Sequence, residues 1–203
     1  MGNIKTAVFV SGGGTNLQAL IDAKNSGVIT DADFTLVLSS NEQAYALTRA
    51  ENAGIKTAVV SRKAAENQQD FERQILKILE ENEIELIVLA GFMSILSADF
   101  TRRYDERIIN VHPALIPSFC GKGYYGLHVH EAALKYGVKV SGATVHFVNE
   151  VPDGGKIIMQ KAVEVDDDDT PETLQRRIME QAEWIILPQS VQKVAKKIKS
   201  EKS

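Results

Sequence analysis

The stretch IELIVLAGF, residues 84–92, decides the fold class of this chain. Successive apolar residues follow Glu85, so both faces of this predicted strand are expected to be buried. Strands of this kind occur in the middle of parallel sheets, where helices cover both sides. The stretch therefore predicts an α/β protein with residues 84–92 near the centre of its sheet.

Short strands alternate with helices on the N-terminal side of this stretch. Such alternation is typical of βαβ units and predicts a Rossmann-like, mostly parallel sheet with helices on both faces. The predicted strands are residues 4–10, 34–40 and 56–60, and the predicted helices are residues 16–27, 42–54 and 69–83.

The C-terminal half has a different pattern. We expect a short fifth strand at residues 107–111 and a helix at 128–137. Two further strands, 139–150 and 155–165, flank the turn residues VPDGG and predict a hairpin.

The last predicted helix begins after Thr170, a suitable N-cap residue, with Pro171 at its first position. The preceding aspartates suit the positive end of that helix. Pro188 is expected to break or kink the helix, and residues 196–203 are expected to be a solvated, fraying end.

The composition excludes several classes of protein. Of 203 residues, 44% are hydrophobic and 25% charged, and the net charge is −4, which is typical of a globular domain without a nucleic-acid partner. No run approaches the roughly 18 apolar residues of a membrane helix. The single cysteine, Cys120, excludes an intrachain disulfide and favours a reducing, cytoplasmic location. We see neither a repeat nor a linker, so residues 1–203 are interpreted as one domain.

The glycine-rich loop SGGGTN, residues 11–16, follows the first strand and opens the first helix. Consecutive glycines let backbone N–H groups turn toward a ligand, and the helix N-terminus adds partial positive charge. The loop is not a dinucleotide fingerprint, because Leu17 stands where the third glycine would be. The loop contains no lysine, so the pattern favours one phosphate over a polyphosphate. A tight turn without a ligand is the alternative.

The segment RIINVHPALIPSF, residues 107–119, places Asn110 and His112 two residues apart at a predicted strand end. Residues i and i+2 of a strand share one face, and Pro113 disfavours a helical conformation at His112. Ligands of open α/β sheets bind at this carboxyl edge. An amide beside an imidazole can stabilise an oxyanion and move a proton. Alternatively, both side chains satisfy backbone groups.

Asp153 lies in the predicted hairpin turn, from which a carboxylate could approach this strand end. A carboxylate near His112 would raise the pKa of the imidazole and hold its orientation. No G-x-S-x-G motif is present and Cys120 has no motif around it, so the sequence favours direct transfer between two bound substrates.

Taken in order, these segments resemble the phosphoribosylglycinamide formyltransferase family, which is folate-dependent and acts in purine synthesis. The matching segments are SGGGTNLQAL, VLAGFMSIL, INVHPALIPSF, GATVHFVNEVPDGGKII and EQAEWIILP. The resemblance covers nearly the whole chain and implies the formyltransferase α/β fold. It implies transfer of the formyl group of 10-formyltetrahydrofolate to the amine of glycinamide ribonucleotide, in the de novo route to IMP.

The resemblance also implies roles for individual residues. Asn110 and protonated His112 would stabilise a tetrahedral oxyanion, and Asp153 would raise the pKa of His112. The implied phosphate and ribose contacts are Gly12, Gly13, Gly14, Thr15, Asn16 and Glu183. The implied folate contacts are Met93, Ser94, Ile95, Leu96, Asn110, Val148, Glu150 and Asp153.

On this basis residues 1–92 form a phosphate-binding half and residues 93–203 a catalytic and folate-binding half. Gln68 departs from the family pattern, because a folate-contacting arginine is expected near it; Arg62 or Lys63 could substitute. Small-molecule substrates are the expected partners of a monomer or homodimer, with no nucleic acid, membrane or metal. His128 and His130 form an H-x-H pair, but the spacing supplies no third metal ligand.

Two alternatives remain open. A 10-formyltetrahydrofolate hydrolase would share Asn110, His112 and Asp153, but such enzymes usually carry an extra N-terminal domain, and the first strand here begins at residue 4. A non-catalytic phosphate-binding module would explain the glycine loop but leave these three residues unexplained.

Overall fold

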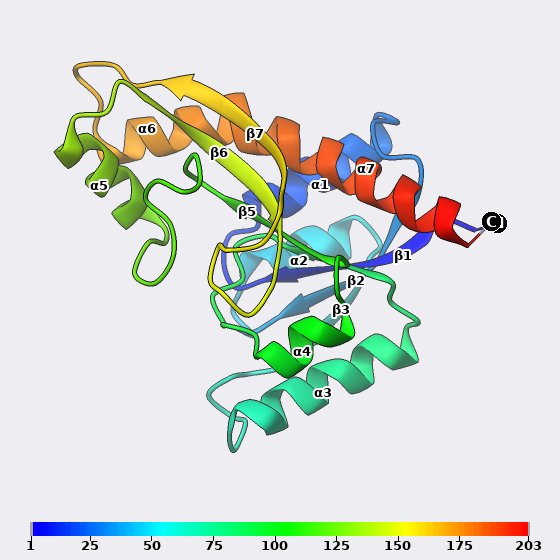
Figure 1. The fold of residues 1–203 in the computed structure, drawn as a ribbon. Coiled ribbons are helices and arrows are strands. Elements are labelled where there is room, and N and C mark those ends of the chain that lie inside the picture. The colour runs from blue at the N-terminus through cyan, green and yellow to red at the C-terminus, as the bar shows by residue number, and fades with distance from the viewer. Residues whose placement is uncertain (1, 203) are drawn as a thin grey trace.

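The computed structural model describes residues 2–202 and is built around one sheet (Figure 1). Within this range the sheet has seven strands in the order β3-β2-β1-β4-β5-β6-β7. Strands β1 to β5 run parallel, and β6 and β7 are antiparallel to their neighbours. The strands are β1 Ile4–Val10, β2 Ala32–Ser39, β3 Lys56–Val59, β4 Leu86–Leu89, β5 Ile108–His112, β6 Val140–Phe147 and β7 Ile157–Glu164.

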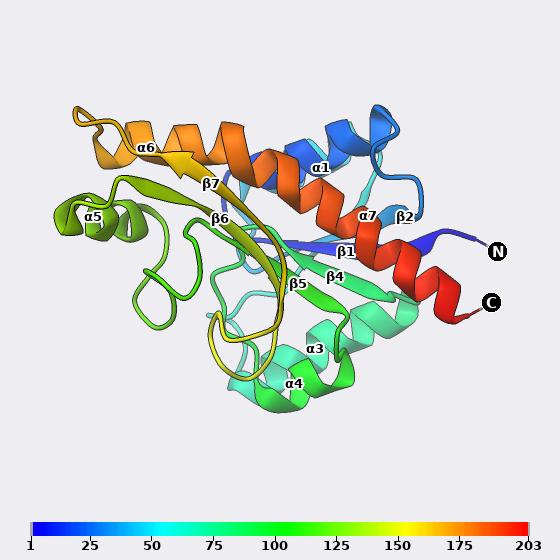
Figure 2. The same cartoon turned by 45° about the horizontal axis from the view of Figure 1, so that its top comes forward.

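Helices cover both faces of the sheet (Figure 2). Helices α3 and α4 pack on one face, and α1, α2, α5, α6 and α7 contribute to the core of the other. The helices are α1 Thr15–Asn25, α2 Tyr45–Asn52, α3 Gln68–Glu81, α4 Ala98–Arg103, α5 Leu127–Tyr136, α6 Pro171–Ile178, the π-helix η1 Met179–Glu183 and α7 Trp184–Glu201. The mostly parallel α/β fold predicted from the sequence is confirmed.

Strand β4 shows why residues 84–92 decide the fold. Leu86 and Val88 point into the core beneath α1 and α7, whereas Ile87 and Leu89 point into the core beneath α3 and α4. All four are buried, as expected for a strand covered on both sides. The strand is shorter than predicted, and Gly91, with φ of 77°, turns the chain beyond its end.

The predicted hairpin and helix start are both confirmed. Strand β6 pairs antiparallel with β7. Thr170 caps α6 by accepting a hydrogen bond from the backbone N–H of Thr173, and Thr173 bonds back to Thr170. Asp169 in the acidic run pairs with Arg177, so this carboxylate stabilises the start of α6.

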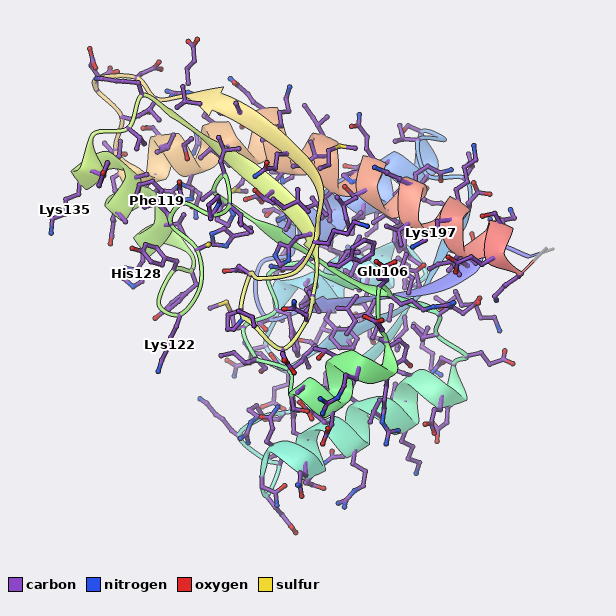
Figure 3. The ribbon with its side chains drawn as sticks, viewed as in Figure 1. Glu106, Phe119, Lys122, His128, Lys135 and Lys197 are labelled. Carbon is purple, nitrogen blue, oxygen red and sulfur yellow. The ribbon has the colours of Figure 1, made fainter. Side chains whose placement is uncertain are left out.

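Two expectations for the C-terminus were wrong. The α-helix is interrupted before Pro188, by the π-helix η1, and α7 then runs through the proline. This register change precedes the position where proline removes a helical hydrogen bond. The end of α7 does not fray from residue 196 onward, because Ile198 is buried and Lys197 pairs with Glu106 (Figure 3).

Helix α4 was not predicted. Ser97 caps its start, and Phe100 is buried against the core under α3. Six residues are too few to show a helical hydrophobic period, which explains the omission.

The first and last parts of the described chain lie close together, and Gly2, Asn3, Lys199 and Lys202 line one pocket near the amino ends of the central strands (Figures 1 and 2). Lys202 pairs with Glu85, which precedes β4, and Lys199 pairs with Asp31, which precedes β2. The last turns of α7 are thereby held against the end of the sheet opposite the carboxyl ends of β1, β4 and β5. No helix within residues 2–202 is long and apolar enough to cross a membrane.

Candidate active site

The glycine loop joins β1 to α1 and leaves the start of that helix uncapped by any side chain in the described chain. Gly14 holds the N-cap position with φ of 74°, and a Cβ there would lie 2.7 Å from the Ala46 Cβ. A Cβ on Gly12 or Gly13 would meet nothing within 4 Å. One side of the loop therefore packs on α2, and the other side borders open space suited to an anion.

Asn16 and Glu183 meet although 167 positions separate them in sequence. The Asn16 Nδ2 group donates to Glu183 Oε2 at 2.7 Å. Burial raises the pKa of Glu183, and the Asn16 hydrogen bond opposes that rise only in part. Asn16 Oδ1 is buried and has no partner among residues 2–202, so it could accept a hydrogen bond from a ligand hydroxyl.

Asn110 and His112 lie on one face of β5, as the strand period predicts. Ile109 and Val111 point into the core under α1 and α7, which leaves Asn110 and His112 on the α3 and α4 face. Strand β6 places His146 opposite Asn110 and Thr144 opposite His112. The register between these strands thus adds a second histidine to the site.

His112 is held by two groups. Its Nε2 atom lies 2.8 Å from the carbonyl oxygen of Phe119, which can only accept, so Nε2 carries a proton. Its Nδ1 atom faces Asp153 Oδ2 at 3.6 Å. Nδ1 is therefore the atom that can gain or lose a proton, and the imidazolium would face a carboxylate.

Asp153 acts on the pKa of His112 in the expected direction, but a second effect outweighs it. Burial lowers the pKa of His112, and this effect exceeds the opposing influence of the Asp153 carboxylate. Asp153 does act to raise the pKa, but the imidazole is only 4% exposed and loses more hydration than one carboxylate restores. In the substrate-free protein the lowered pKa of His112 favours the neutral imidazole, which leaves Nδ1 free to accept a proton.

Asp153 approaches the strand end from the β6–β7 hairpin, with φ of 56°. Its Oδ2 accepts from the Gly121 N–H at 2.8 Å, and its Oδ1 lies 3.5 Å from His146 Nε2. Burial acts to raise the pKa of Asp153, but the Gly121 hydrogen bond and the two neighbouring histidines, His146 foremost, together lower it. The carboxylate therefore stays ionised between the two imidazoles.

Three polar side chains outside the predicted site residues hold this site together, and two of them, Thr144 and Gln160, were not singled out in the sequence. His146 donates from Nδ1 to the Phe147 carbonyl, which leaves Nε2 to face Asn110 Nδ2 at 3.3 Å. Thr144 donates to the Ala114 carbonyl, while Gln160 donates to Thr144 and to the Ile116 carbonyl. Thr144 and His146 are two residues apart in an alternating strand, so the strand period could have grouped them.

The segment after β4 lies beside the glycine loop. The Met93 N–H donates to Ser11 Oγ at 3.0 Å. Met93 and Ile95 are 59% and 72% exposed, whereas Leu96 is buried. Leu96 belongs to the core under α3 and α4, and Val148 packs against the same core. Large apolar side chains are thus exposed at the carboxyl edge of the sheet.

The structure places the other predicted folate contacts, Ser94 and Glu150, as follows. Ser94 is half-buried, and Glu150 is exposed with its carboxylate 3.9 Å from Arg102. Gln68 donates to Glu72 and, at 3.0 Å, to the Ile95 carbonyl. It therefore links α3 to the segment of residues 93–96. The Arg62 guanidinium lies over the Phe71 ring, with 5.8 Å to its centroid.

A family model described as formyl transferase matches residues 4–191. This chain belongs to the formyl transferase family. It is 42% identical over 184 residues to the phosphoribosylglycinamide formyltransferase of Haemophilus influenzae, covering 91% of this chain and 84% of that protein. It resembles the crystal structure of phosphoribosylglycinamide formyltransferase from Brucella melitensis, with a TM-score of 0.87 and 40% identity over 95% of this chain and 96% of that one.

A longer relative shares the same formyl transferase region. The trifunctional purine biosynthetic protein adenosine-3 of Gallus gallus is 43% identical over 192 residues, which are 95% of this chain. The chain spans 18% of the length of that protein. The family membership and the formyltransferase fold expected from the sequence are confirmed by these comparisons.

The loop between β5 and α5 carries Lys122 at its tip, where the side chain points away from the fold (Figure 3). His128 is exposed and lies 3.0 Å from Glu131, whereas His130 is buried. Across residues 2–202, no group of three or more His, Cys, Asp or Glu side chains is arranged to hold a metal ion.

Proposed function

We propose that this formyl transferase moves the formyl group of 10-formyltetrahydrofolate to the amine of glycinamide ribonucleotide, giving formylglycinamide ribonucleotide and tetrahydrofolate. The observation that carries the proposal is the convergence of Asn110, His112 and Asp153 at the carboxyl end of β5. The relatives named phosphoribosylglycinamide formyltransferase support this pair of substrates.

The ribonucleotide phosphate binds at the glycine loop and the first turn of α1, through Gly12 to Asn16. The uncapped N-terminus of α1 and the open side of Gly12 and Gly13 support this role. Glu183 and the unpartnered Asn16 Oδ1 accept hydrogen bonds from the ribose end. The phosphate thereby positions the substrate amine toward β5.

The folate ring binds along residues 93–96, closed on its other side by the hairpin residues Val148, Glu150 and Asp153. The exposed side chains of Met93 and Ile95 fit a flat, partly apolar ring. Ser94 and Leu96 contribute mainly through the backbone. When bound, 10-formyltetrahydrofolate supplies the activated formyl group beside Asn110.

His112 handles the proton of the reaction. It begins as a neutral imidazole with Nδ1 available, because burial lowers its pKa. Nδ1 accepts the proton released from the attacking amine, and the resulting imidazolium is stabilised by Asp153. His112 then returns the proton to the leaving nitrogen.

Asn110 stabilises the negative charge that develops on the formyl oxygen. A fixed donor aimed at such a charge contributes roughly 3–4 kcal/mol to transition-state stabilisation. His146 Nε2, 3.3 Å from Asn110 Nδ2, fixes the orientation of the amide. Holding both substrates in line lowers the entropic barrier further.

One sheet contains strands from both halves of the chain, which supports residues 1–203 as a single domain with a phosphate-binding half, 1–92, and a catalytic half, 93–203. The cytoplasmic location and the monomeric or dimeric state remain predictions. Size-exclusion chromatography with light scattering would decide the latter.

The deciding experiment follows the absorbance of the folate product from 10-formyltetrahydrofolate, with and without glycinamide ribonucleotide. Product that forms only with the ribonucleotide is the expected result. Equal product without it would contradict the proposal and indicate hydrolysis. Binding of both compounds without any product would indicate a non-catalytic binding module.

A further inference from the structure

Arg49 has no role in the mechanism above, yet it contacts the glycine loop. It lies in the last turn of α2, and its Nε group donates to the Gly13 carbonyl at 2.9 Å. Its Nη1 group donates to Gln18 Oε1 on α1 at 3.1 Å. The guanidinium lies over the Tyr45 ring, with 5.1 Å to its centroid. Arg49 therefore ties α2, the loop and α1 together.

A second hydrogen bond acts on the same side of the loop. The Ala46 N–H, in the first turn of α2, donates to the Gly12 carbonyl at 3.0 Å. N–H groups in a first turn have no partner within their own helix. Two successive carbonyls of the loop, those of Gly12 and Gly13, are thus held toward α2.

The orientation of these carbonyls determines where the loop N–H groups point. In a trans peptide unit the C=O and N–H bonds lie in one plane and point in opposite directions. The Gly12 carbonyl shares its unit with the Gly13 N–H, and the Gly13 carbonyl shares its unit with the Gly14 N–H. Both N–H groups therefore point away from α2. A Cβ on Gly13 would meet nothing within 4 Å, so the side away from α2 is open.

We infer that Arg49 is a positioning residue for phosphate recognition: it fixes the Gly13–Gly14 peptide unit so that the Gly14 N–H faces the substrate phosphate. The inference rests on the proposed function, because it assumes a phosphate at Gly12 to Asn16. Arg49 acts through the loop and does not itself touch the substrate. Arginine suits the role because its planar fork reaches the Gly13 carbonyl and Gln18 together, which a lysine ammonium cannot do.

The test measures steady-state kinetics of Arg49→Met and Arg49→Lys with glycinamide ribonucleotide and with its 5′-hydroxyl analogue, which lacks the phosphate. Loss of a charge-assisted hydrogen bond predicts that Arg49→Met raises KM for the ribonucleotide about 10- to 100-fold. Its kcat and its KM for the folate should not change. KM for the analogue should also be unchanged, because there is no phosphate to recognise.

Arg49→Lys should raise KM for the ribonucleotide by a smaller factor, about three- to tenfold, since the charge remains but the fork is lost. Arg73→Met is the matched control, because Arg73 is exposed and pairs with Asp70 within α3. It should behave as wild type. If Arg49→Met does not fold, Arg49→Lys decides alone.

Three results would overturn the inference. The first is an unchanged KM for the ribonucleotide in both Arg49 variants, and the second is an equal rise in KM for the ribonucleotide and for the analogue. The third is a wild-type KM in Arg49→Lys, which would assign the effect to charge alone. Failure of the proposed function is separate from all three, because wild-type protein would then form no ribonucleotide-dependent product.

Discussion

The glycine loop and the end of β5 lie at the same edge of the sheet but are built from different parts of the chain. The loop offers backbone N–H groups, and its glycines provide a conformation and an open space. The end of β5 offers side chains, of which His112 and Asp153 come from elements 41 positions apart. A site made from backbone should tolerate changes of side-chain chemistry but not of shape, whereas a site made from side chains should show the reverse.

The largest expected effect follows from His112→Ala. This change removes the proton acceptor and should lower kcat about 10³-fold with little change in either KM. The folate-release assay measures it, and circular dichroism checks the fold. His128→Ala is the matched control, because His128 is exposed and bonds to Glu131 on its own helix. Loss of less than tenfold in His112→Ala would remove this residue from the proton transfer.

The backbone-built site is tested by Gly14→Ala. The left-handed φ of 74° disfavours alanine, and the new Cβ would lie 2.7 Å from Ala46. Together these effects should lower the free energy of unfolding by roughly 3–4 kcal/mol and raise KM for the ribonucleotide. Urea unfolding measures the first effect.

Gly27→Ala is the comparison that separates backbone strain from steric contact with Ala46 in the Gly14→Ala variant. Gly27 has φ of 79°, but a methyl group added there would meet nothing within 4 Å, so only the backbone strain of about 1–2 kcal/mol should appear. Equal losses in both variants would show that close packing of α2 on Gly14 is unimportant.

The residues of the glycine loop and of the β5 end could be predicted from the sequence, because both regions are marked by local patterns. Three consecutive glycines at a strand-to-helix turn, and Asn110 and His112 two residues apart before a proline, are readable without tertiary information. Their contact with distant groups is not. The register of β5 against β6 decides that His146 faces Asn110, and the burial of His112 decides its net pKa. Neither quantity is encoded near the residue concerned.

His130, a buried histidine without a hydrogen-bond partner in the described chain, should make the stability of the fold sensitive to acid. Both nitrogens of His130 lack a hydrogen-bond partner in the described chain, and burial lowers its pKa to about 4. Because the unfolded chain binds this proton near pH 6.5, His130 favours the folded state above that pH, and this contribution is lost as pH falls toward 4. The loss is about 3 kcal/mol.

His130→Leu should therefore lose less stability than wild type between pH 7 and pH 4. Urea unfolding at both pH values measures the difference, and His128→Gln serves as the exposed control. A variant as acid-sensitive as wild type would show that His130 titrates normally.

Asp153→Asn should have the smallest effect of these substitutions. It should change both kcat and the pH profile. Loss of the charge beside the imidazolium should lower kcat about tenfold. Asp153 acts to raise the pKa of His112, so its removal should move the acidic limb of kcat/KM to still lower pH. Asp167→Asn, an exposed carboxylate paired with Lys139, is the control. A limb that moves to higher pH would contradict the assignment of His112 as the titrating group.

The adjacent chain ends bear on how this fold can be combined with others. The start of β1 and the end of α7 both lie at the amino ends of the strands, whereas the glycine loop and His112 lie at the carboxyl ends. A partner domain fused to either end would therefore stand clear of the site. A short peptide could also join the ends, so that circular permutants opened in a surface loop should retain the arrangement of the site.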